Sequence, residues 1–133
     1  MVRWALRVML GCLFLAVFLR FQPSAWGAEG YMTYYTAESC QKEGTSGVFT
    51  ASGEVFDEGA LTCAIRGRGF GDEYVIYSPD TGRQVIVRHN DYGPGKGPAS
   101  RGVIIDTTPA VWQALGLDVR VGKVEVCIQR VEG

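Results

Sequence analysis

The chain has 133 residues, among them 18 glycines, 13 basic and 14 acidic side chains and a single histidine. This length leaves room for one domain, and one histidine excludes a histidine-rich zinc site. No basic patch is interleaved with aromatic residues, which argues against a nucleic-acid partner.

Residues 1–27 have the organisation of a secretory signal peptide. Two arginines form a positive n-region, an apolar stretch runs from Val8 to Leu19, and Ala25 and Gly27 are the small residues of a cleavage site. The apolar stretch is shorter than the roughly 20 residues that span a bilayer. We therefore predict a signal peptide, with an uncleaved signal anchor as the alternative.

Export changes the charge and defines the domain. All 14 acidic residues but only 10 of the 13 basic ones follow residue 27, so the mature chain carries a net charge near −4. We expect one domain over residues 28–133, secreted or periplasmic in the cell envelope and monomeric. Its only link to a membrane would be the signal segment, if that segment stays uncleaved.

The elements expected after the signal are mostly short strands. In chain order they are an aromatic strand over 31–36, a polar loop over 38–47, strands over 48–50, 60–65, 73–77 and 83–89, and a last strand over 119–131. A Ser-Pro-Asp-Thr-Gly turn between the strands at 73–77 and 83–89 indicates a hairpin.

One substantial helix is predicted near Thr108–Leu115. Thr107 or Thr108 can cap it, Pro109 suits its first position and Gly116 can close it. Within it Val111, Trp112 and Leu115 stand at helical spacing and should face the core. Many short strands, one short helix and a high glycine content indicate an all-β protein built as a small closed barrel.

Two carboxylates stand at the ends of two apolar strands. A β-branched run delivers His89, Asn90 and Asp91 before a loop rich in glycine and proline, and the run Val103–Ile105 then presents Asp106. Two acids placed in this way can converge on one cleft. Ordinary turn or cap roles are the alternative, above all for Asp106, which precedes the helix.

Four segments, followed by Ile104-Ile105-Asp106 and the helix, carry a resemblance to a known family. They are Tyr34-Tyr35, Thr50-Ala51-Ser52-Gly53-Glu54-Val55-Phe56-Asp57, Ala60-Leu61-Thr62 and Val87-Arg88-His89-Asn90-Asp91-Tyr92-Gly93-Pro94. In this order they resemble the RlpA-like (rare-lipoprotein-A-like) double-psi β-barrel family, which is related to expansins and barwin-type domains. Over residues 30–131 the resemblance implies an all-β, six-stranded double-psi β-barrel with one short helix and an open groove.

The resemblance also implies a lytic transglycosylase that cleaves the MurNAc–GlcNAc backbone of peptidoglycan glycan strands without a cofactor or a metal. An acid protonates the leaving oxygen, and the sugar's own 6-hydroxyl then attacks the anomeric carbon. Asp91 matches the family's acid, and Glu54 matches the glutamate of the T-A-x-G-E segment. Two neighbouring carboxylates would raise the pKa of one of them. Asp106 matches an aspartate that lines the groove in expansin-like relatives.

Two residues depart from the family pattern. Ile65 stands where enzymatic members carry a histidine, and Tyr92 replaces an arginine. His89 could substitute for the missing histidine, because strand alternation puts it on the same face as Asp91. The alternative is that His89 is a plain strand residue.

A non-catalytic, expansin-like module that binds glycans or loosens the wall is the second functional hypothesis. Tyr34, Tyr35 and Tyr92 would then offer stacking surfaces to sugar rings, with barrel core or rim as the alternative for each. The predicted substrate-binding residues are His89, Tyr92, Asp106, Tyr35 and Arg88.

Three cysteines follow the signal: Cys40, Cys63 and Cys127. They allow at most one internal disulfide, and their spacing has no metal-binding pattern. Expansin-like relatives carry cysteines in comparable segments, which implies a Cys40–Cys63 bridge. Closing that loop of about 24 residues would contribute roughly 3 kcal/mol. A Cys63–Cys127 bridge is the alternative.

Overall fold

The computed structural model describes residues 27–44, 47–67 and 69–132. The predicted signal peptide therefore lies, apart from Gly27, outside the described residues. Within the described ranges no helix is both long and apolar enough to cross a membrane.

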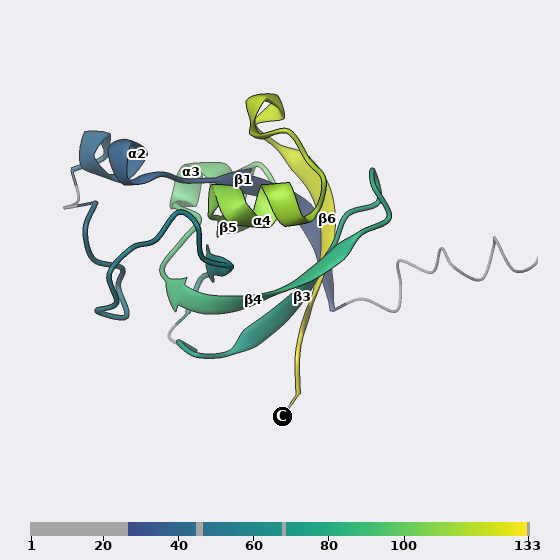
Figure 1. Cartoon of the computed structure of the whole chain (residues 1–133), viewed down its shortest axis with the longest axis horizontal. Coiled ribbons are helices and arrows are strands. Elements are labelled where there is room, and N and C mark those ends of the chain that lie inside the picture. The colour runs from purple at the N-terminus through teal and green to yellow at the C-terminus, as the bar shows by residue number, and fades with distance from the viewer. Residues whose placement is uncertain (1–26, 45–46, 68, 133) are drawn as a thin grey trace, which may run out of the picture.

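Six strands close into a barrel (Figure 1). They are β1 (Ala28–Tyr34), β2 (Thr62–Ala64), β3 (Glu73–Tyr77), β4 (Gln84–Asp91), β5 (Val103–Thr107) and β6 (Val124–Arg130). Around the barrel their order is β1-β5-β2-β4-β3-β6. The pairs β1–β5 and β2–β4 are parallel, and the other four are antiparallel. The predicted all-β, six-stranded barrel is confirmed.

The short helices differ in part from the prediction. The predicted helix is α4 (Pro109–Ala114), with Thr108 at its N-cap position. The predicted polar loop instead begins with α2 (Ala37–Lys42), because Thr36 and Ser39 form a capping box. A further short helix, α3 (Lys96–Ser100), precedes β5.

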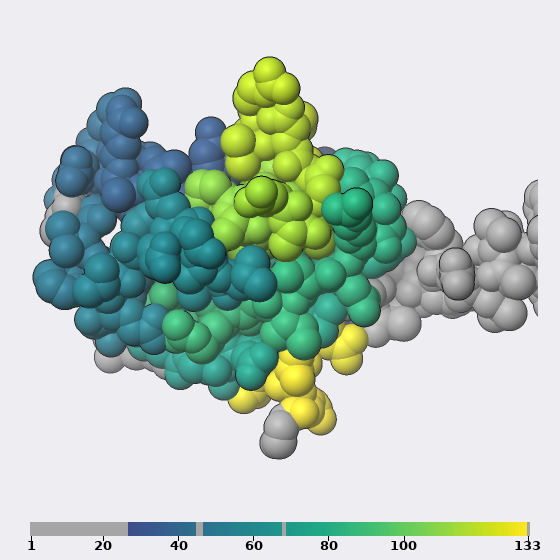
Figure 2. Space-filling view, viewed as in Figure 1, coloured from purple at the N-terminus to yellow at the C-terminus, as the bar shows by residue number. Residues whose placement is uncertain are grey.

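The last strand is shorter than predicted. A 3₁₀ turn, η2 (Val119–Val121), occupies the first part of the expected strand, and β6 begins at Val124. Asp118 caps this turn by accepting a hydrogen bond from the N–H of Arg120, and Gly122 leaves it with a φ of 81°. In Figure 2 η2 projects from the molecule, while the blue-to-teal stretch with α2 and the following segment forms one side.

Alternation along the strands builds the core inside the barrel. On β6 the side chains of Val124, Val126 and Ile128 join this core, and Met32, Ile76, Val87 and Ile105 join it from other strands. Helix α4 adds Val111 and Trp112, and its C-cap residue Leu115 joins them; all three are fully buried, as predicted for the helix's core face.

Alternation on β4 is interrupted where this strand runs beside β2. His89 pairs with Cys63, but the next pair is Ala64 with Asp91, so Asn90 is an extra residue in a β-bulge. His89 and Cys63 are buried on the inner side, whereas Ala64 and Asp91 line a pocket outside the barrel. The expectation that His89 and Asp91 share a face is therefore wrong, because the bulge reverses the alternation between them.

Candidate functional site

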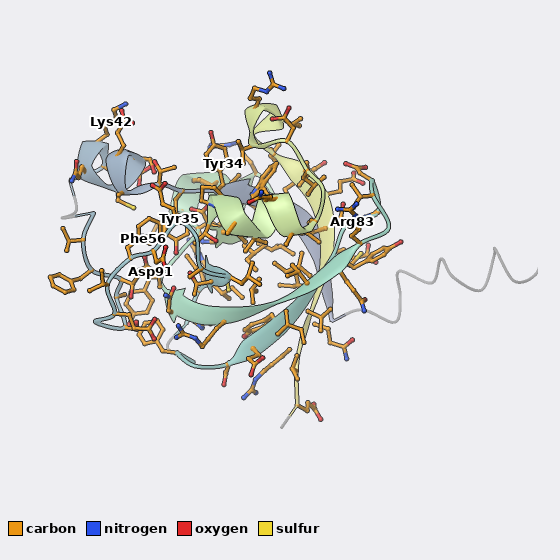
Figure 3. The ribbon with its side chains drawn as sticks, viewed as in Figure 1. Tyr34, Tyr35, Lys42, Phe56, Arg83 and Asp91 are labelled. Atoms are coloured by element: carbon orange, nitrogen blue, oxygen red, sulfur yellow. The ribbon has the colours of Figure 1, made fainter. Side chains whose placement is uncertain are left out.

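A pocket of about 400 Å³ lies between the barrel and the segment around α2. Among its lining residues are Tyr35, Phe56, Ala64, Asp91, Tyr92 and Asp106. Figure 3 shows Tyr35, Phe56 and Asp91 lying together below α2, near the end of β4. Two of the predicted site carboxylates, Asp91 and Asp106, thus meet in one pocket.

The register of three adjacent strands places these two acids. Ala64 of β2 pairs with Asp91 of β4 on one side and with Asp106 of β5 on the other. Neighbouring strands lie about 4.8 Å apart, so the two backbones are separated by roughly 10 Å. The alanine methyl group between them leaves the floor of the pocket open.

Among the carboxyl groups of the pocket, Asp106 has a pKa that differs clearly from its usual value. Burial raises its pKa to about 6, and the charges of Glu43 and Asp91 act in the same direction. The Thr33 hydroxyl donates a 3.0 Å hydrogen bond to Oδ1 and opposes this rise. The alternative role as a helix cap is not seen, since the N-cap residue is Thr108.

Asp91 is held by four hydrogen bonds. Its Oδ1 accepts the backbone N–H groups of Ala51 at 3.0 Å and of Tyr92 at 2.9 Å. Its carbonyl oxygen accepts the N–H of Ile65 at 3.2 Å and contacts Nε2 of His89 at 2.9 Å. Both the side chain and the main chain of Asp91 are therefore fixed relative to the pocket.

Glu54 is paired with a cation and is not among the residues that line the pocket. The Arg88 guanidinium binds both of its carboxylate oxygens, with Nη2 2.8 Å from Oε2, and Asn90 Nδ2 donates to Oε2 at 3.2 Å. The hydrogen bonds from Arg88, and then from Asn90, lower the pKa of Glu54. The rise in pKa expected for one carboxyl group therefore falls on Asp106.

The same contacts define the place of Arg88. Its guanidinium is engaged by Glu54, 34 residues away in sequence, and does not line the pocket. The pair fastens the segment that carries Glu54 onto β4, where Ser52 N–H also donates to the Asn90 carbonyl at 3.1 Å.

The predicted aromatic residues divide into three environments. Tyr92 lies at the pocket, 47% exposed, with its ring 5.1 Å from that of Phe70. Tyr35 also lines the pocket but is 7% exposed, and its ring packs against Phe56 at 4.9 Å. Tyr34 packs instead against Trp112 of α4, with the ring centroids 5.7 Å apart.

Two aromatic pocket residues, Phe56 and Phe49, were missed by sequence reasoning. Phe49 lines the pocket and is 62% exposed. It lies in a hairpin where it forms an isolated bridge with Val55, in a stretch that the sequence predicted only as a short strand. An exposed aromatic side chain next to the T-A-x-G-E segment was the available signal.

His89 lies inside the barrel and is 1% exposed. Its ring contacts those of Phe70 and Tyr74, with centroid distances of 5.1 and 6.4 Å. It is not among the residues that line this pocket, so its predicted role in substrate binding has no support from the pocket geometry. The bulge at Asn90 is the reason, since it separates the face of His89 from that of Asp91.

The predicted Cys40–Cys63 disulfide is not formed, and neither is the alternative Cys63–Cys127 bridge. Cys63 is fully buried in the barrel core, whereas Cys40 lines the pocket with Ala64, the neighbour that faces the opposite way on β2. Burial raises the pKa of the Cys63 thiol to about 12. In the part of the chain that is described, no group of three metal-ligating side chains is placed to hold a metal ion.

Curated proteins of three organisms are similar in sequence to part of the chain. Each is named a probable endolytic peptidoglycan transglycosylase RlpA. Identity is 46% over 66 residues for Treponema pallidum, 37% over 75 for Nostoc sp. and 38% over 74 for Synechocystis sp.. These matches cover 50%, 56% and 56% of this chain but only 19%, 19% and 22% of the relatives. The matched stretch is therefore about a fifth of each relative's length.

Solved structures show where the fold has been seen before. The apo expansin of Clavibacter michiganensis matches with a TM-score of 0.56 and 17% identity, covering 78% of this chain and 50% of the expansin. A variant of that expansin in complex with cellohexaose matches equally well. At this identity the likeness concerns the fold. No family model matches the chain.

Proposed function

Because the chain is an RlpA-like, expansin-related double-psi β-barrel, we propose that it is a lytic transglycosylase that acts on peptidoglycan glycan strands. The observation that carries this proposal is the pair Asp91 and Asp106 in one pocket, with burial raising the pKa of Asp106 to about 6. A carboxyl group of this kind keeps its proton up to about pH 6, whereas an ordinary aspartic acid loses it near pH 4, so it can donate a proton in mildly acidic solution.

In the proposed reaction Asp106 is the acid. It protonates the glycosidic oxygen while the bond from that oxygen to the anomeric carbon breaks. The 6-hydroxyl oxygen of the same sugar then bonds to the anomeric carbon, and its proton passes to Asp91 across Ala64. No water is consumed, and the product ends in a 1,6-anhydro sugar. Return of this proton from Asp91 to Asp106 then completes the cycle.

This assignment gives Glu54 a supporting task in place of the catalytic one expected from the sequence. Its ion pair with Arg88 and its bond from Asn90 fasten the segment that includes Ala51 to β4. The N–H of Ala51 in turn holds Asp91 Oδ1. Glu54 and Arg88 would thus act on substrate only through Asp91.

Non-catalytic glycan binding is the second candidate, and the exposed rings of Tyr92 and Phe49 at the pocket favour it. Exposed aromatic faces are suited to stacking on sugar rings. The expansin variant of similar fold forms a complex with cellohexaose, which is also a β-linked glycan. Either function requires export, which we propose the signal peptide over residues 1–27 provides for the domain at 28–133.

The test is incubation of the mature protein with purified sacculi, followed by mass spectrometry of the soluble products. We expect 1,6-anhydro muropeptides from the wild-type protein and none from Asp106→Asn. Binding to sacculi without release of anhydro products would favour the second candidate. Failure to bind sacculi would exclude both.

A further inference from the structure

The single histidine of the chain makes an unusual contact with the backbone of a pocket residue. Nε2 of His89 lies 2.9 Å from the carbonyl oxygen of Asp91, two residues further along β4. Because a carbonyl oxygen only accepts, Nε2 carries the proton in this contact. Nδ1 is buried and has no hydrogen-bond partner among the described residues.

The β-bulge makes this contact possible. In a regular strand the side chains of residues 89 and 91 would point the same way, and both would enter the core. With Asn90 as an extra residue, the Asp91 carboxyl group turns to the pocket, while its carbonyl oxygen is reached from inside the barrel. The contact thus joins the interior to a residue of the pocket wall.

His89 is held through both its main chain and its ring. The backbone N–H of His89 donates to the Asp72 carbonyl at 2.8 Å, and the His89 carbonyl accepts from the N–H of Gly71 at 2.8 Å. The rings of Phe70 and Tyr74 pack edge-on against the imidazole. A buried donor fixed in this way can in turn fix what it binds.

We propose that His89 is a positioning residue for Asp91, acting from within the barrel and never touching the substrate. The Asp91 carbonyl receives two donors, Nε2 of His89 and the N–H of Ile65, and these set the bulge that aims the carboxyl group across Ala64. The catalytic consequence rests on the proposed function, whereas the positional one is a property of the fold.

Two amide variants distinguish a contact made by Nε2 of His89 from one made by Nδ1. The side-chain amide of His89→Gln extends about as far as Nε2, whereas that of His89→Asn reaches only about as far as Nδ1. His89→Leu removes the donor while keeping apolar volume. Val87→Ala serves as the matched control, because Val87 is a core residue of the same strand and has no hydrogen bond to Asp91.

The first readout is amide hydrogen exchange at Ile65, Ala51 and Tyr92, whose N–H groups all bind Asp91. We expect exchange at these amides to rise by roughly tenfold or more in the Leu and Asn variants, and by less than about threefold in Gln and Val87→Ala. The second readout is turnover on sacculi. A misplaced Asp91 should lower kcat roughly 10- to 100-fold with little change in KM, in the Leu and Asn variants only.

Equal behaviour of the Gln and Asn variants, or wild-type exchange in the Leu variant, would overturn the proposal. If the wild-type protein releases no anhydro product, the proposed function is wrong. The exchange pattern would still decide whether His89 positions Asp91. A third measurement needs no variant. The ¹⁵N spectrum of the single histidine should show a proton on Nε2, and a proton on Nδ1 alone would contradict the contact.

Discussion

Asp91 and Asp106 flank the same residue, Ala64, from the two strands on either side of β2. The two acids come from distant parts of the sequence, and a side chain no larger than a methyl group separates them. Both the pocket floor and the distance between the acids therefore depend on β2, a strand of three residues.

Filling this floor should abolish turnover without unfolding the protein. Ala64→Leu adds side-chain volume in the pocket between the two acids, where a sugar ring would have to lie. We expect loss of anhydro-product release with a stability change within roughly 1 to 3 kcal/mol, the usual cost of overpacking. Ala64→Ser is the control and should remain active. An active Leu variant would mean that the reaction does not occur between these acids.

Replacing Asp106 should change the pH dependence of stability. Because the folded pKa of about 6 lies above the usual aspartic acid pKa of 3.8, the folded state binds this proton more tightly, and stability is lost as pH rises through about 6. Asp106→Asn removes this loss, so it should be more stable than wild type at pH 7 by up to roughly 3 kcal/mol. Near pH 3 the two proteins should be about equal. Thermal unfolding at both pH values gives the comparison, and parallel pH profiles would contradict the raised pKa.

Turnover should follow the same titration. If Asp106 donates the proton, kcat should fall as pH rises above about 6, because the acid form is then lost. Release of anhydro products from sacculi between about pH 5 and 8 gives the profile. A rate that increases over this interval would remove Asp106 from the role of acid.

Glu54→Gln should affect activity less than Asp91→Asn does. Glu54 lies outside the pocket lining, and its ion pair with Arg88 is partly exposed, so the expected cost in stability is below about 1 kcal/mol. Turnover and the free energy of unfolding of the two variants give the ranking. An equal loss of turnover in both would return Glu54 to the chemistry.

Tyr92 and Tyr34 form a matched pair for glycan binding. Tyr92 lies at the pocket, whereas Tyr34 packs on Trp112 away from it, although both rings are partly exposed. Tyr92→Ala should weaken binding to sacculi, measured by co-sedimentation, by roughly 1 kcal/mol. Tyr34→Ala should leave this binding unchanged. Equal weakening would place the glycan elsewhere on the surface.

Most of the secondary structure could be predicted from sequence patterns. The six strands and α4 follow from alternation, turn residues and the Thr-Pro…Gly signals, and the helix buries Trp112 as its spacing predicts. The capping box of α2 was also present in the sequence, but Ser39 is a weaker signal at that position than Glu or Gln.

The faces of β2 and β4 could not be predicted in the same way. The bulge at Asn90 has no glycine or proline within it to mark it, and it alone separates His89 from the pocket. The pairing of Arg88 with Glu54 spans 34 residues. Non-local pairing of this kind leaves no local pattern, so Glu54 and His89 looked like pocket residues.

The opposite orientations of Cys63 and Ala64 on β2 have an evolutionary consequence. Loss or gain of one residue that shifts this strand by one position would exchange the two faces, placing a thiol between the acids and a methyl group in the core. Lineages carrying this barrel should therefore keep a constant count of residues through β2. Selection would preserve which residue of β2 faces the core and which faces the pocket, even where it tolerates a different side chain.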